Sequence, residues 1–341
     1  MKNKRILSGI QPSGTLHIGN YFGAIRQFLN LQVENECYYF IANYHALTTI
    51  SDPKILAENS RQVALDYLAL GLNPEKAALF MQSDVPEVTE LAWILSTVTS
   101  MGLLERAHSY KDKTARGILP SHGLFAYPVL MAADILIYDS DLVPVGKDQK
   151  QHLEMTRDIA IRFNNIYGEI LTVPEPMILS DVAVVPGIDG QKMSKSYDNT
   201  LEIFLEYKPL KKKVMRIVTD SKSLEESKDP EASTIIDLYK LFATPVELND
   251  MKKNFLSGEY GYGHAKKELL DKMFSYFEDA RNKRNELQNN LDYIEEVLQE
   301  GAKKARKRSS EVMERVRQAV GIIRPEIVLQ KMFEEKLLLK K

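Results

Sequence analysis

The sequence predicts an α/β fold with a parallel sheet in residues 1–198, followed by a mainly helical part in residues 199–341. Short β-type segments alternate with helical patterns over the first part, and strand signals vanish after residue 201. Long, charged, amphipathic patterns replace them. Alternation of strands and helices at these lengths is typical of a parallel sheet with helices on its faces.

The first part contains four predicted strands: residues 5–10, 37–42, 77–82 and 142–145. A helical pattern begins near His17 and runs towards Leu31. The next helix is expected from Pro53 to about Leu70, with Asp52 as its N-cap, because Asp is favoured there and Pro suits the first turn. Further helices are expected to begin at Pro86 and near residue 148, the latter running to about residue 163.

A long apolar stretch, LFAYPVLMAADILIY at residues 124–138, carries a single carboxylic acid, Asp134. Pro128 suits the first turn of a helix. In a helix, Tyr127, Met131 and Asp134 share one face. That face could line a ligand pocket. The alternative is an ordinary buried helix whose acid pairs with a neighbouring side chain.

The second part is expected to be helical, with breaks at residues 221–233 and 258–263. Residues 287–321 could form one nearly continuous helix, with Gly301 as a candidate break. The last helices could also pack back on the first part of the chain.

Charge differs between the two parts, although the whole chain has a net charge of only −2. Residues 1–200 hold 17 Lys and Arg against 22 Asp and Glu, and residues 201–341 hold 28 against 25. The densest basic run is residues 303–308, which suits either a nucleic-acid contact or a solvated helix face.

The single cysteine, Cys37, excludes an internal disulfide and a multi-cysteine zinc site. No apolar run reaches membrane-spanning length, and the N-terminus lacks the apolar core of a signal peptide. We therefore expect a cytoplasmic protein without a membrane partner.

Residues 9–20, GIQPSGTLHIGN, form a glycine-containing turn between a predicted strand and a helix. Such a turn presents free backbone N–H groups and the positive end of a helix dipole, which together bind anions. His17 and Asn20 could add side-chain donors, and Gly19 would let a flat ring approach the backbone. A plain strand–helix connection explains the pattern equally well.

Residues 184–196, VVPGIDGQKMSKS, form a second loop, at the boundary of the two parts. Lys192 and Lys195 are mobile charges that could follow negative charge on phosphates. A loop in this position is a candidate lid. The alternative is a solvated linker.

Two motifs carry a family resemblance. His17-Ile18-Gly19-Asn20 and Lys192-Met193-Ser194-Lys195-Ser196 resemble the paired signatures of class I aminoacyl-tRNA synthetases. SGIQPSG at residues 8–14, MAADIL at 131–136 and PVGKDQKQH at 144–152 narrow the resemblance to the bacterial tryptophanyl-tRNA synthetase family. It spans nearly the whole chain. Asn20 stands where many members of the class have a second histidine, and Asn is usual in this family.

The resemblance implies a Rossmann-like catalytic domain in residues 1–198 and a tRNA anticodon-binding helical domain in residues 199–341. It also implies L-tryptophan, ATP with Mg²⁺ held mainly by the ATP phosphates, and tRNA(Trp) as partners, and a homodimer as the working form. No dedicated metal site is expected. The tail after Gly321 is longer than the family usually has, and its expected place is against its own or a partner subunit.

The resemblance also implies roles for individual residues. Those implied in catalysis are Lys192, Lys195, His17 and Asn20. Those implied in ATP binding are Gln11, Pro12, Ser13, Gly19, Asn20, Gly146, Lys147, Asp148, Val184, Val185, Lys192, Met193, Ser194, Lys195 and Ser196. Those implied in tryptophan binding are Asp134, as acceptor of the indole N–H, and Tyr127, Met131, Gln149, Leu7, Val143 and Val145. Lys113 could reach pyrophosphate or be an ordinary surface lysine. The remaining histidines, His45 and His152 among them, are expected to be structural or exposed.

Three alternative functions stay open. Tyrosyl-tRNA synthetases share the fold and also use a carboxylate in their pocket. A small-molecule nucleotidyltransferase would need no helical domain of this size. A catalytically inactive tRNA-binding paralogue would be expected to have a broken ATP motif, whereas both motifs are intact here.

Overall fold

A computed structural model describes residues 3–107, 110, 121–146, 149–178 and 184–322 of the chain. Its centre is a sheet of five parallel strands in the order β3-β2-β1-β4-β5. The strands are β1 (Arg5–Ile10), β2 (Glu36–Ile41), β3 (Ala77–Met81), β4 (Leu142–Val145) and β5 (Glu175–Ile178). The predicted parallel α/β class is confirmed.

Four of the five strands lie within one residue of their predicted bounds, because each is a short apolar run between turn signals. The sequence analysis missed β5, an edge strand of four residues that contains Pro176. Proline weakens a strand signal because it cannot donate to the ladder, and it is tolerated at the edge of a sheet.

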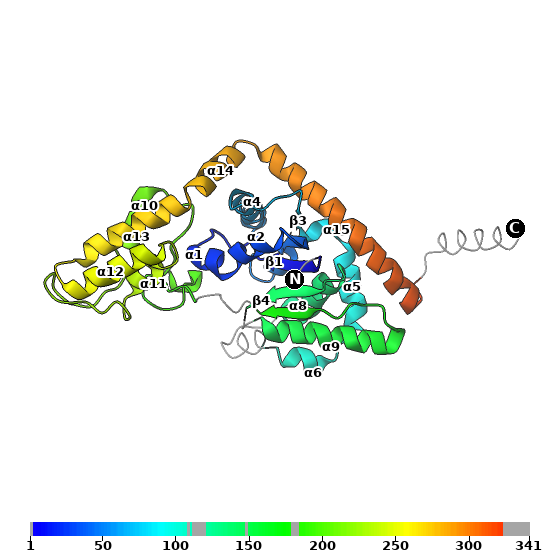
Figure 1. Ribbon diagram of the computed structural model, residues 1–341. Helices are drawn as coiled ribbons and strands as arrows, with labels where there is room; N and C mark the ends of the chain where they lie inside the picture. Colours follow the sequence, from blue (N-terminus) through cyan, green and yellow to red (C-terminus); the bar gives the residue numbers. More distant parts are fainter. Residues whose placement is uncertain (1–2, 108–109, 111–120, 147–148, 179–183, 323–341) are drawn as a thin grey trace, which may run out of the picture.

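Helices cover both faces of the sheet (Figure 1). In the first part of the chain they are α1 (Ile18–Asn20), α2 (Arg26–Leu31), α3 (Asn43–Ala46), α4 (Pro53–Ala69), α5 (Glu87–Ser96), α6 (Met101–Glu105), α8 (His122–Leu136) and α9 (Lys150–Tyr167). A π-helical segment, Tyr21–Ile25, joins α1 to α2, and a 3₁₀ turn, Gln82–Asp84, follows β3. Asp52 caps α4 as predicted, since its carboxylate accepts from the N–H groups of Lys54 and Ile55.

The position of Pro128 differs from the prediction. It lies inside α8 rather than in its first turn, because Ser121 caps the helix earlier by accepting a hydrogen bond from the N–H of Leu124. A proline inside a helix leaves the carbonyl four residues before it, here that of Leu124, without its helical donor. The shared face of Tyr127, Met131 and Asp134 is unaffected.

The described residues after β5 contain helices and no further strand, as predicted. They are α10 (Tyr207–Val214), α11 (Thr234–Tyr239), α12 (Pro245–Ser257), α13 (Tyr262–Tyr276), α14 (Glu278–Gln288) and α15 (Leu291–Val320), with a 3₁₀ turn at Lys195–Tyr197. Helices α10 to α13 form a helical body beside the sheet (Figure 1), and its buried apolar residues belong to the same cluster as those of β1 and β2. The domain boundary near residue 199 stays a prediction.

The last helix, α15, returns to the first part of the chain and packs on β3 and α5 (Figure 1). Gly301 does not break it. A Cβ at Gly301 would lie 1.9 Å from the carbonyl oxygen of Leu79, so this glycine lets the helix approach the strand backbone. The break in the predicted continuous helix lies at residues 289–290 instead, where Asn290 caps α15 through the N–H of Tyr293.

Most basic side chains of the run at residues 303–308 form contacts with other parts of the same chain. Lys304 donates to the carbonyl of Pro74 at 2.9 Å, Arg306 donates to the carbonyl of Asp84, and Arg308 pairs with Asp139 at 2.5 Å. These contacts tie α15 to the α/β part, so neither a free nucleic-acid surface nor a fully solvated face describes this run. None of the described helices is long and apolar enough to cross a membrane.

We predict that Gly301→Ala lowers the free energy of unfolding by about 1–3 kcal/mol, because the added methyl group forces α15 away from β3. Equilibrium denaturation in urea measures this. The matched control is Gly263→Ala in α13, where a Cβ would meet nothing within 4 Å. There alanine is expected to be neutral or slightly stabilising. Equal unfolding midpoints for the two variants would contradict the packing role of Gly301.

Candidate active site

A cavity of about 520 Å³ opens at the carboxyl ends of the strands. The chain adds β2 and β3 on one side of β1, and then β4 and β5 on the other. Ligands of open parallel sheets bind at such a switch point, in the crevice outside the strand ends. Side chains from β1 and β4, including Leu7 and Val145, form its floor.

All seven residues predicted to bind the amino acid line this one cavity, together with Gln11 from the predicted ATP set. The complete lining is Leu7, Ser8, Gly9, Gln11, Phe40, Ala42, His45, Thr48, Thr49, Leu124, Tyr127, Met131, Asp134, Ile135, Val143, Pro144, Val145, Gln149 and His152. Apolar walls with a few polar groups are typical of a small-molecule site.

Asp134 lines the cavity and has only 1% of its surface exposed. Its two carboxylate oxygens accept from Nε2 of Gln82 at 2.8 and 3.0 Å, and Oδ2 lies 2.7 Å from Nε2 of His45. Burial raises the pKa of Asp134, and the bonds from His45 and Gln82 oppose this shift. The carboxylate is therefore both a paired buried acid and part of the cavity wall.

These partners do not saturate Asp134. A carboxylate offers about four acceptor positions, and Gln82 and His45 supply three contacts between them. An N–H donor of a flat ring in the cavity can still be accepted. Gln82 and His45 meanwhile fix the orientation of the carboxyl group, so the acceptor is oriented before a ligand arrives.

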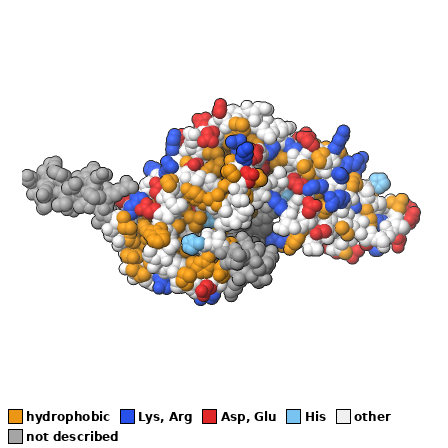
Figure 2. Space-filling model, turned by 180° about the vertical axis from the view of Figure 1, so that it is seen from behind, with side chains coloured by type: hydrophobic (Ala, Val, Ile, Leu, Met, Phe, Trp, Pro, Cys, Tyr) orange, Lys and Arg blue, Asp and Glu red, His pale blue; other side chains and the backbone are white. Residues whose placement is uncertain are grey.

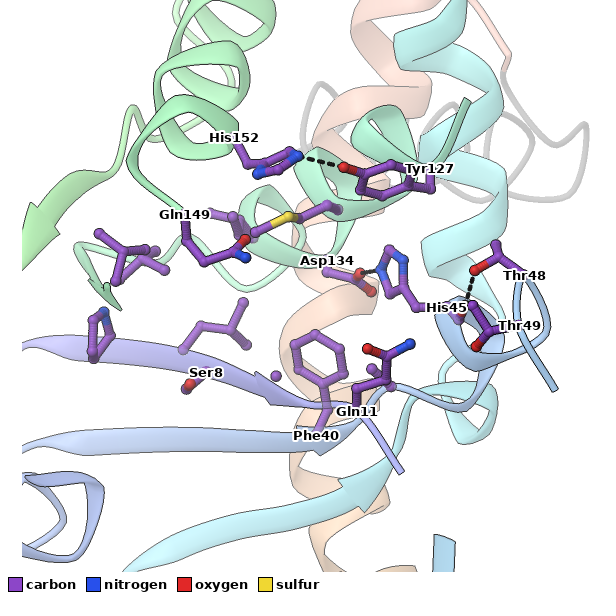
Figure 3. A pocket seen from close by; sticks show the side chains of 18 of the residues that line it. Ser8, Gln11, Phe40, His45, Thr48, Thr49, Tyr127, Asp134, Gln149 and His152 are labelled. Carbon is purple, nitrogen blue, oxygen red and sulfur yellow. Dashed lines mark hydrogen bonds and ion pairs between the residues drawn. The ribbon is translucent and has the colours of Figure 1, made fainter. Parts of the chain in front are cut away.

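The other polar side chains of the cavity are also held in place. The hydroxyl of Tyr127 is hydrogen bonded to Nε2 of His152, and the centroids of the two rings lie 5.5 Å apart. Gln149 and Gln11 approach the cavity from beyond β4 and β1 respectively (Figure 3). Figure 3 shows Asp134 and His45 pointing towards each other between them.

Sequence reasoning missed His45 and Gln82, and it gave His152 only a supporting place on its helix. In the structure His45 and His152 line the cavity, and both His45 and Gln82 are hydrogen bonded to Asp134. One signal in the sequence could have identified His45 and Gln82. Gln11, His45, Gln82 and Gln149 each follow the carboxyl end of a different strand, from β1 to β4. Those ends meet at one edge of a parallel sheet.

The two predicted phosphate loops meet in the structure. The ammonium group of Lys195 donates to the carbonyl oxygen of Ser13 at 2.9 Å and lies 3.5 Å from its hydroxyl. A Cβ on Gly19 would lie 2.9 Å from Nδ1 of His17, so this glycine leaves room for the imidazole ring beside the loops. Partial burial lowers the pKa of Lys195, and nearby Asp66 and Glu202 oppose this shift.

His17 is buried beside these loops, and burial together with the Lys195 ammonium lowers its pKa to about 4. It is therefore neutral at pH 7, and can donate a hydrogen bond to phosphate without adding charge. The side-chain oxygen of Asn20 accepts from the N–H of His17 at 3.1 Å. This leaves the amide NH₂ of Asn20 as its donor group.

Asn199 organises the second loop from within, although the sequence marked it only as a boundary. Its side chain donates to Asp189 at 2.8 Å and to the carbonyl of Lys192 at 3.1 Å, and accepts from the N–H of Ser194 at 2.7 Å. A Cβ at Gly187 would lie 2.3 Å from the Asn199 amide, so glycine is required for this close approach.

The remaining residues that were predicted to bind ATP differ in how exposed they are. Val185 is buried and its carbonyl accepts from the N–H of Met193 at 2.9 Å, whereas Val184 is 69% exposed. Pro12 is buried, and Lys192, Ser196 and Gly146 are exposed. Lys147, Asp148 and Lys113 lie outside the described residues. No cluster of three or more metal-ligating side chains occurs among the residues that are described.

Comparison with known proteins decides the family. Residues 1–278 match the model of class I tRNA synthetases for tryptophan and tyrosine. A tryptophan–tRNA ligase of Fusobacterium nucleatum is 58% identical over 94% of this chain and 98% of its own length. One of Rhodopirellula baltica is 54% identical over 93% and 99%. The chain belongs to the bacterial tryptophanyl-tRNA synthetase family.

A solved structure agrees with this assignment to the tryptophanyl-tRNA synthetases. The tryptophanyl-tRNA synthetase of Campylobacter jejuni, crystallised with ADP and tryptophan, superposes with a TM-score of 0.90. It is 52% identical and covers 93% of this chain and 99% of its own. The predicted family resemblance and the expected combination of a Rossmann-like sheet with helices are thereby confirmed.

We predict that Asp134→Asn lowers kcat/KM for the amino acid at least tenfold and leaves the affinity for ATP nearly unchanged. An amide turns an NH₂ group towards the donors of His45 or Gln82 and removes a charged acceptor, which contributes about 1.5–3 kcal/mol. Steady-state kinetics with tryptophan and a separate ATP titration measure this. Asp84→Asn, on the same edge of the sheet but outside the cavity lining, is the matched control. An unchanged kcat/KM in the Asp134 variant would refute its role.

Proposed function

We infer that this chain is a tryptophan–tRNA ligase, which uses ATP to join L-tryptophan to tRNA(Trp). The observation that carries this inference is the 58% identity to a tryptophan–tRNA ligase over nearly the full length of both chains. The geometry of the cavity agrees with it but would also suit tyrosine, since both rings carry a donor that a carboxylate accepts. The tyrosyl alternative is therefore disfavoured by the relatives and not by the cavity.

The reaction has two steps. A carboxylate oxygen of tryptophan attacks the α-phosphorus of ATP, the bond to the β-phosphate breaks, and pyrophosphate leaves. A hydroxyl of the terminal tRNA ribose then attacks the carbonyl carbon of the adenylate, and AMP leaves. Phosphoryl transfer of this kind depends on alignment and charge neutralisation more than on a protein base.

For tryptophan, we propose that the indole N–H donates to Asp134 while Leu7, Met131, Val143 and Val145 contact the ring. Tyr127 and Gln149 bind the α-amino group or the carboxylate. An amino acid without a ring donor would leave the buried Asp134 acceptor unpaired, and sites of this kind reject such analogues by about 10⁴–10⁵. A separate editing site is then unnecessary.

For ATP, we propose that His17, Asn20 and the backbone of residues 11–13 contact the phosphates. Gly19 makes room for the nucleotide, and the backbone of Val184 or Val185 contacts adenine. Lys192, Ser194 and Lys195 neutralise charge as pyrophosphate forms. Mg²⁺ enters as part of the MgATP substrate, held mainly by phosphate oxygens and water.

We also propose that the helical part binds the anticodon of tRNA(Trp), and that the protein works in the cytoplasm as a homodimer. The dimer proposal is supported by an apolar surface beside the cavity, where Trp93 is 73% and Leu47 60% exposed. A hollow of about 370 Å³ lined by Trp93, Leu47 and Leu130 lies within it. Exposed apolar patches of this kind are typical of protein interfaces.

The direct test is ATP–pyrophosphate exchange measured with each of the twenty amino acids. We expect exchange with tryptophan. For phenylalanine, which lacks the ring donor, we expect kcat/KM to be at least a thousandfold lower. Preferential exchange with tyrosine would establish the tyrosyl alternative. ATP binding without exchange for any amino acid would favour a catalytically inactive paralogue.

We predict that Lys195→Ala slows adenylate formation at least tenfold, which corresponds to about 1.4 kcal/mol of activation free energy. The variant removes both the charge for the leaving pyrophosphate and the hydrogen bond to the Ser13 carbonyl. Single-turnover kinetics with tryptophan and ATP measure this step. Lys240→Ala, which removes an exposed lysine paired with Asp237 in α11, serves as control. A near-normal rate for the Lys195 variant would contradict the proposed role.

A further inference from the structure

Helix α10 carries a row of basic side chains on its exposed side. Lys208, Lys211, Lys212 and Arg216 are all exposed, the last just beyond the end of the helix. Lys208, Lys212 and Arg216 follow one another at intervals of four residues, a spacing that keeps them on one side of a helix. None of the four forms a salt bridge with any acid among the described residues.

Several other lysines of the helical part, by contrast, are each paired with an acidic side chain. Each of the following lies within 4.0 Å of an Asp or Glu: Lys240, Lys252, Lys253, Lys272 and Lys283. The surface seen from behind also shows Lys and Arg side chains gathered over the upper side of the helical part (Figure 2). Like charges four residues apart repel one another and destabilise a helix. A bound polyanion would neutralise this row and remove the repulsion.

The opposite side of α10 fixes the helix relative to the ATP loops. Leu210 and Val214 are buried in the helical core. Lys213 pairs with Glu202 at 2.5 Å and donates to the carbonyl of Thr200 at 3.3 Å. Glu202 in turn forms a β-bridge with His17, so the basic row stands on a helix anchored to the first phosphate loop.

We propose that this basic row, residues 208, 211, 212 and 216, binds the phosphate backbone of tRNA while the cavity holds the adenylate. The proposal rests on the proposed function. Lysine and arginine at an exposed helix face bind phosphates without reading bases. The row would therefore position the tRNA body beside the ATP loops, and base recognition would lie elsewhere.

Two charge-matched variants test this. The first combines Lys208→Gln, Lys211→Gln, Lys212→Gln and Arg216→Gln. The control combines Lys240→Gln, Lys252→Gln, Lys253→Gln and Lys283→Gln, which removes the same charge from the same part of the molecule. The dissociation constant for tRNA(Trp) is measured by filter binding over a series of KCl concentrations, and tryptophan-dependent pyrophosphate exchange is measured in parallel.

We expect the first variant to bind tRNA at least tenfold more weakly at about 0.1 M salt. The slope of log K against log[salt] should fall by about 0.7–0.9 for each phosphate that the variant no longer neutralises. The control should bind within about twofold of the unmodified protein. Both should keep normal pyrophosphate exchange, because the first step needs no tRNA. Replacing the three lysines by arginine, which keeps the charge, should preserve the slope.

An unchanged slope in the first variant, or equal weakening in both variants, would overturn the proposal. Failure of the unmodified protein to catalyse tryptophan-dependent exchange would be a separate result, since it would refute the proposed function itself.

Discussion

The buried carboxylate of Asp134 constrains much of the site around it. An ionised carboxyl group at 1% exposure must be hydrogen bonded or take up a proton, and here the donors come from Gln82 and His45, beyond the ends of β3 and β2. The acid itself stands on α8. One side chain thus links α8 to the segments that follow β2 and β3, and the carboxylate is held in place before any ligand binds.

The sequence predicted the parallel sheet and the strand bounds because these depend on local patterns, whereas the seven cavity residues were implied by the resemblance to the family. The apolar runs of β1 to β4 stand between clear turn signals. Tyr127, Met131 and Asp134 are spaced so that any helix places them on one face. These features need no knowledge of distant contacts.

Features that depend on distant contacts were not predictable in this way. Gly301 looks like a helix breaker until the Leu79 carbonyl is known to lie against it. Asn199 looks like a linker residue until its three hydrogen bonds within the loop are seen. The basic run at residues 303–308 suggested a free surface, whereas Lys304, Arg306 and Arg308 bind the α/β part. His45 carries no motif of its own, and only the strand order places it beside Asp134.

The return of α15 to β3 has a mechanical consequence. Residues 207–276 leave the α/β part after the second phosphate loop and rejoin it through α14, where Arg284 pairs with Asp66 at 2.6 Å. The body is also held between these two ends, because the rings of Tyr21 and Phe22 pack against Phe277 and Phe242. The β-bridge between Glu202 and His17 lies at the same junction, so a displacement of this body would be transmitted directly to His17 and to the first phosphate loop.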